Sequence, residues 1–162
     1  MNTQKDEIEK WKNSMIKSAK QNWNNDKELM PVAMLYTAED KNIIVAMPFS
    51  SQREKELCSV KLKALVREEK AIAVIFIHEG YMKQFKEKDM NAFNEYKKGN
   101  TSIKDMDGRI ETIVIVFETK SGEKELTTIE INDKKLGKQN TINDGQSGGL
   151  FSNFFATPIW VN

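Results

Sequence analysis

The chain of 162 residues has one cysteine, one histidine and three prolines, and these scarcities exclude whole classes of structure. With Cys58 alone, no disulfide can form within the chain, and no cysteine cluster can hold zinc or an iron–sulfur centre. No apolar run approaches the ~20 residues that cross a bilayer. The N-terminus lacks the apolar core of a signal peptide. We therefore expect a cytoplasmic protein with no membrane association.

Charge of one sign is also lacking, since 25 basic and 24 acidic residues leave a formal net charge of +1. Such a balance creates no overall field for nucleic acid or for an anionic membrane. The lysines between Tyr81 and Gly108 alternate with acidic residues, as on an ordinary solvated face. We predict no nucleic-acid partner, and the residue types suggest neither a cofactor nor a metal.

The strongest pattern present is the unbroken apolar run Ala71–Ile77. A run of this length with β-branched residues is typical of a strand covered on both faces, so we expect it at the centre of a sheet. Near the N-terminus, residues 5–24 show the spacing of an amphipathic helix. Its apolar positions are Ile8, Trp11, Met15, Ile16, Ala19 and Trp23. This stripe predicts a helix docked on the chain's own sheet, with a partner-binding helix as the alternative.

Turn and capping signals divide the rest of the chain. Two hairpins are expected, one from residues 32–36 and 43–47 and one from residues 109–118 and 124–131. Ser51 and Glu54 form a capping box that opens a central helix ending near Lys70. Residues 81–100 predict a short helix or a long loop. The sequence therefore predicts an α+β domain, a five-stranded and mainly antiparallel sheet with the N-terminal and central helices packed on one face.

Composition changes after residue 136. Residues 1–136 are expected to form the single α+β domain, and residues 137–149 a flexible linker because they are rich in glycine and polar residues. Residues 150–162 form an aromatic C-terminal tail, whose candidate partner-binding residues are Phe151, Phe154, Phe155 and Trp160. Because exposed aromatic side chains are unfavourable in water, the tail either folds back onto its own sheet or docks into another chain.

The element order is similar to that of the profilin-like group, which includes roadblock and longin domains. Two segments, Phe76–Met82 and Asp107–Glu111, also resemble those of small uncharacterised bacterial and phage proteins. This second resemblance covers about residues 30–132 and implies no activity. Both resemblances concern the fold, and fold does not carry function.

Candidate chemistry gathers where the apolar run ends. His78 and Glu79 follow it directly, and Glu111 begins the next long strand. A histidine and two carboxylates at one sheet edge could bind a divalent metal or perform acid–base catalysis. They converge only if the chain turns at Gly80, since neighbours on a continuing strand point to opposite faces. The alternative is a histidine that closes the end of a buried strand. Cys58 is expected to be a buried structural residue.

Two functions therefore remain open. The first is a small non-catalytic protein-interaction domain, which meets another protein or a second copy of itself through an outer helix, a sheet edge or the aromatic tail. The second is a small enzyme or metal-binding domain that uses His78, Glu79 and Glu111. Whether the chain is an enzyme is not decided by its residues.

Overall fold

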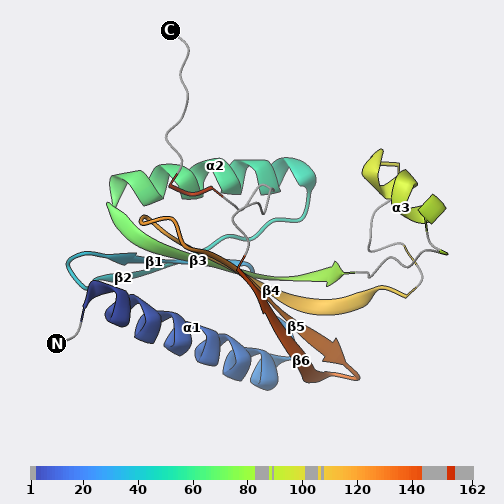
Figure 1. Ribbon diagram of the computed structural model, residues 1–162, viewed down its shortest axis with the longest axis horizontal. Coiled ribbons are helices and arrows are strands. Elements are labelled where there is room, and N and C mark those ends of the chain that lie inside the picture. The colour runs from blue at the N-terminus through green and yellow to red at the C-terminus, as the bar shows by residue number, and fades with distance from the viewer. Residues whose placement is uncertain are drawn as a thin grey trace, which may run out of the picture.

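The computed structural model describes residues 3–82, 88, 90–100, 106, 108–143 and 153–155. Within them, an open antiparallel sheet lies between two helices, giving three layers (Figure 1). The strand order is β2-β1-β3-β4-β5-β6. The elements are α1 (Gln4–Asp26), β1 (Val32–Thr37), β2 (Asn42–Ala46), α2 (Gln52–Glu68), β3 (Ala71–Met82), α3 (Met90–Lys97), β4 (Ile110–Thr119), β5 (Lys124–Asn132) and β6 (Lys135–Ile142). The α+β class, the N-terminal helix and the antiparallel sheet are as predicted.

The prediction of five strands is wrong, because β6 forms a sixth. It takes residues 137–142 from the segment that we expected to be a linker. Almost all of its side chains are exposed, and neither face needs apolar residues. Its sequence therefore lacks the apolar alternation by which a strand is predicted. Asp133 and Lys134, with φ of 50° and 61°, make the two-residue turn that joins it to β5. This turn contains no glycine, so a second sequence signal was also missing.

β3 is the central strand, as its apolar run predicts. Every residue from Ala73 to Ile77 has no exposed surface. Because side chains alternate along a strand, Ile75 and Ile77 contact the α1 side while Val74 and Phe76 contact the α2 side. Both faces of β3 are therefore core.

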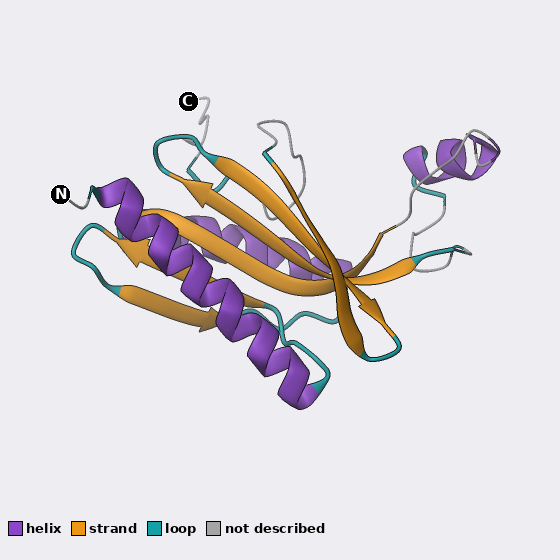
Figure 2. Cartoon of the chain, turned by 60° about the horizontal axis from the view of Figure 1, so that its bottom comes forward, coloured by secondary structure: helices purple, strands orange, loops and turns teal. Residues whose placement is uncertain are grey.

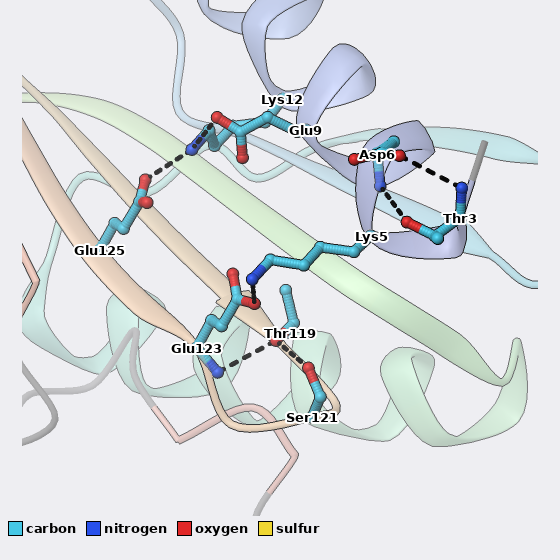
Figure 3. A network of polar contacts seen from close by, with 9 residues as sticks. All are labelled: Thr3, Lys5, Asp6, Glu9, Lys12, Thr119, Ser121, Glu123 and Glu125. Atoms are coloured by element: carbon cyan, nitrogen blue, oxygen red, sulfur yellow. Dashed lines mark hydrogen bonds and ion pairs between the residues drawn. The ribbon is translucent and has the colours of Figure 1, made fainter. Parts of the chain in front are cut away.

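α1 docks on the sheet as expected, running along one face of it (Figure 2). Four residues of its apolar stripe are buried, namely Ile8, Trp11, Ala19 and Trp23. Polar contacts hold its first turns over the β4–β5 hairpin (Figure 3). Lys12 Nζ lies 2.8 Å from Glu125 and 2.9 Å from Glu9, and Lys5 Nζ lies 3.6 Å from Glu123. Both apolar burial and ion pairing thus fix this helix.

α2 covers the opposite face, so the expectation of both helices on one face is wrong. Ser51 accepts a hydrogen bond from the Glu54 backbone N–H and caps the helix, as predicted. Its buried residues Leu62 and Val66 pack with Phe76 of β3. The physical reason why helices pack on both faces of the sheet is the sequence of β3. Its side chains are apolar on both faces, so each face is stable only when a helix covers it.

Candidate functional site

The predicted site lies where β3 leaves the core. The strand does not turn at Gly80 but continues to Met82, paired with β4 throughout. His78 and Glu79 therefore point to opposite faces of the sheet. The trio of His78, Glu79 and Glu111 does not assemble.

His78 belongs to the α2 face. Its Nδ1–H donates to the Glu79 backbone carbonyl at 2.9 Å. Its ring centroid lies 5.4 Å from that of Phe76 and 6.5 Å from that of Phe49. Burial lowers the pKa of His78, and the charge of Lys55 lowers it further against the opposing effect of the backbone hydrogen bond. A half-buried neutral ring among aromatic neighbours fits the expected alternative, a histidine that closes the end of a buried strand.

Glu79 belongs to the α1 face. Its Oε1 accepts a hydrogen bond from Trp23 Nε1 at 3.0 Å, and its carboxylate also accepts from the Leu29 backbone N–H. Burial raises the pKa of Glu79, and the nearby charges of Glu111 and Glu28 add to that rise, while the two hydrogen bonds oppose it. Glu79 is thus a carboxylate held in place by the end of α1, with an increased affinity for a proton.

Glu79 and Glu111 line a groove beside the end of α1. Tyr81 pairs with Glu111 and Glu79 with Ile113, so the two carboxylates are diagonal neighbours on one face, roughly 7–8 Å apart at Cα in such a ladder. The groove has a volume of about 490 Å³. Its lining residues are Trp23, Lys27, Glu79, Glu111, Ile131, Asp133 and Lys134. A smaller hollow of about 320 Å³ shares Glu79, Glu111 and Ile131 with it. We call the two together the Glu79 groove.

The chemistry open to the Glu79 groove is acid–base or ionic. A carboxylate with a raised pKa can accept or release a proton near its working pH, and two carboxylates together attract a cationic group. Lys27 and Lys134 at the rim offset part of that charge. Among the residues that the structure describes, no group of three His, Cys, Asp or Glu side chains is arranged to hold a metal ion.

The aromatic tail provides a second site. Phe154 is 1% exposed and packs in the core cluster of the α2 face, while Phe155 is half-buried against the same cluster. The carboxylate of Glu118 accepts the backbone N–H groups of Asn153 at 2.8 Å and of Phe154 at 2.9 Å. Lys124 Nζ donates to Asn153 Oδ1. We call this arrangement the tail seat.

The tail seat changes the interpretation of the predicted partner-binding residues. Phe154 is buried in the core of its own chain, so its side chain is not accessible to another protein in this structure. Phe155 packs beside it. Phe151 and Trp160 lie outside the described residues, and their assignment stays a prediction.

Sequence reasoning missed Glu118 and the role of Trp23. Glu118 is 2% exposed at an inward position of β4, following Val116 on the same face. A carboxylate in that alternation is the one signal that could have singled it out, because a buried charge needs partners. Trp23 was predicted on the helix stripe, but nothing local shows that its indole N–H reaches Glu79.

Cys58 is only half-buried, so the expectation of a buried cysteine is not met, and its Sγ lies 3.7 Å from the Pro48 carbonyl oxygen. None of the helices described is long and apolar enough to cross a membrane. No protein-family model, curated protein or solved structure matches this chain. The resemblances to profilin-like domains and to bacterial and phage proteins therefore stay predictions.

Proposed function

We propose that this chain is a small non-catalytic domain that binds another protein, and that its binding surface is the α3 arm. The α3 arm consists of α3, the last two residues of β3 (Tyr81 and Met82), the first residue of β4 (Ile110) and Arg109, which directly precedes β4. It projects beyond the three layers of the fold (Figures 1 and 2).

The observation that supports the proposal most is that α3, unlike α1 and α2, contributes no buried residue to the fold while it carries exposed apolar side chains. Tyr81, Met90 and Tyr96 are 42%, 47% and 38% exposed, and α3 contains no buried residue. A helix of eight residues is marginal in water, because most helical stability in proteins comes from packing an apolar face. Contact with a partner would supply that packing.

Two cation–π contacts place cationic groups beside aromatic rings on the arm. Arg109 lies 5.7 Å from the Tyr81 ring centroid, and Lys97 Nζ lies 5.4 Å from that of Phe93. Aromatic residues and arginine are enriched among the residues that dominate protein interfaces. The arm therefore fits a partner surface with an apolar groove and an acidic rim.

The test is a comparison of two serine pairs. In one chain Met90 and Tyr96 become serine; in the matched control the exposed Leu57 and Val60 on the outer side of α2 become serine. Proteins captured by the immobilised wild type are identified, and each is then purified and titrated against all three chains. We expect the arm variant to bind at least tenfold more weakly and the control to bind as the wild type does. Equal binding by the arm variant would contradict the proposal.

A second candidate function rests on the Glu79 groove, which could bind a small cationic ligand or use Glu79 as an acid or base. The supporting observation is the carboxylate pair in a groove of about 490 Å³, within the size range of ligand sites. This candidate does not use His78. Glu79→Gln retains the acceptor for Trp23 but loses the charge, so loss of ligand binding in that variant with an unchanged fold would support it.

A further inference from the structure

We propose that β2 pairs with the β2 strand of a second copy of this chain, so that two sheets join into one across a two-fold axis. In the described part of the chain β2 is an edge strand, with β1 on one side only. This edge is separate from the α3 arm, and the inference does not depend on the proposed function.

The pairing of β2 with β1 decides which backbone groups lie on the free side of β2. The Met47 N–H donates to the Pro31 carbonyl at 2.8 Å, and these two residues continue the β1–β2 register. Because hydrogen-bonded and non-hydrogen-bonded pairs alternate in an antiparallel ladder, Ile43 and Val45 also bond to β1. The residues between them direct an N–H and a C=O outward. They are Asn42, Ile44 and Ala46.

A second copy fits these outward groups when the two-fold axis passes through Ile44. Each Ile44 then exchanges both of its backbone hydrogen bonds with its counterpart, and Asn42 pairs with Ala46 on either side. No residue of β2 carries a charge, so the self-pairing brings no like charges opposite each other. The Ile44 side chain, 62% exposed in the single chain, packs against the Ile44 side chain of the second copy.

The charges beyond the ends of β2 are compatible with the same register. Lys41 falls opposite the uncharged Met47, so no repulsion arises there. Glu39 in the β1–β2 turn falls beside Phe49 of the second copy, and Lys55 Nζ lies 5.2 Å from the centroid of that ring. An attraction between Glu39 and Lys55 is therefore available at both ends of the interface.

The other edge of the sheet is protected against such pairing, whereas β2 is not. β6 carries Lys135 and Lys138, and its pairing with β5 contains a register shift. Charged residues, prolines and bulges are the means by which edge strands avoid pairing with further strands. β2 contains no charged residue and no proline, and its register with β1 is unbroken. A second copy is the one such strand that is present wherever this protein is.

Analytical ultracentrifugation of matched variants tests the inference. Ile44→Lys places two like charges at the two-fold axis, and Ile142→Lys makes the same change at an exposed position of β6 as the control. The wild type and the control are expected to shift from 18.7 kDa to twice that mass between about 1 μM and about 1 mM. Ile44→Lys should associate at least about tenfold more weakly. A wild type that stays monomeric, or an Ile44→Lys chain that dimerises as the wild type does, would contradict the proposal.

Mixing two variants tests the position of the two-fold axis. Ile44→Glu alone is also expected to be monomeric, because two carboxylates then meet at the axis. An equimolar mixture of Ile44→Lys and Ile44→Glu should recover the dimer, since opposite charges face each other in the mixed pair. If the mixture stays monomeric while both chains are folded by circular dichroism, the proposed register is wrong.

Hydrogen exchange of the wild type provides a measurement that needs no variant. Dimerisation bonds the N–H groups of Ile44 and Ala46, whereas those of Ile43 and Val45 are bonded to β1 in both states. We expect the first two amides to exchange at least about tenfold more slowly at high concentration than at low, with the other two unchanged. Equal exchange of Ile44 at both concentrations would overturn the proposal.

Discussion

α1 covers its face of the sheet with one continuous helix, whereas the opposite face is covered by α2 together with Phe154 from the far end of the chain. The first cover is anchored by Trp11 and Trp23 and by ion pairs to the β4–β5 hairpin. The cover of the α2 face is completed by residues 153–155, whose backbone N–H groups at Asn153 and Phe154 donate to the Glu118 carboxylate. We therefore expect that the α1 face is exposed only when the whole helix detaches, and that residues 153–155 can detach while the sheet and both helices stay in place.

Trp23→Ala is the substitution with the largest expected effect. Trp23 is 2% exposed and donates to Glu79, so its truncation leaves a large cavity and removes a partner of a carboxylate. We expect the free energy of unfolding to fall by about 3–5 kcal/mol. Urea unfolding followed by circular dichroism measures it. A loss below about 1 kcal/mol would show that α1 is not essential to its face.

Phe154→Ala tests the other cover. Removing the buried ring should cost about 1.5–3 kcal/mol, which is the burial energy alone, without the cost of a persistent cavity that Trp23→Ala adds. The smaller cost follows because the tail can open locally without unfolding of the sheet. Hydrogen exchange should show faster exchange at the Phe154 amide and unchanged protection in β3. An equal loss of protection in β3 would mean that both covers unfold as one unit.

The helix caps allow a finer comparison of α1 with α2. Thr3 accepts from the Asp6 N–H, and Ser51 accepts from the Glu54 N–H. Thr3→Ala and Ser51→Ala should each cost about 1 kcal/mol, and the corresponding serine-to-threonine or threonine-to-serine exchanges much less. Thermal unfolding of the four variants measures the difference. If the alanine and conservative variants behave alike at one helix, that cap does not stabilise it.

The free energy of unfolding should change with pH in opposite directions for Glu79, on the α1 face, and Glu54, in α2. The pKa of Glu79 is raised, mainly by burial, so the folded state binds its proton more tightly than the unfolded state does. The stability that this group contributes is greatest in acid, and it is lost as pH rises from the ordinary glutamate value of 4.5 through the raised pKa of Glu79. Glu79→Gln should remove that fall.

Glu54 on the α2 side should behave in the opposite way. Hydrogen bonds from the Ser50 backbone and side chain lower the pKa of Glu54, with the Ser51 backbone adding to the effect. Its contribution is present above the ordinary value and is lost as pH falls through the lowered pKa. The stability gap between the wild type and Glu54→Gln should therefore close in acid. Urea midpoints across the acid range, with side-chain carboxyl shifts from NMR, measure both groups; equal signs would contradict this account.

Local sequence patterns predicted most of the fold correctly. The stripe of α1, the Ser51 cap and the two hairpins appear at nearly the expected residues. β6 could not be predicted, since a polar edge strand exposed on both faces has no periodic signal. The sequence predicts that His78, Glu79 and Glu111 meet only if the chain turns at Gly80. The strand continues through Gly80, so Glu79 and Glu111 share one face of the sheet and His78 lies on the other.

The sequence by itself determined that Ala71–Ile77 would be a central strand, because a segment apolar on both faces is stable only when both are covered. It also determined the amphipathic helix that covers one of them. Only the tertiary structure decided which face each helix covers, and that Trp23 meets Glu79 and Glu118 receives the tail. These contacts join residues far apart in the chain, so their formation depends on the assembled sheet rather than on local periodicity.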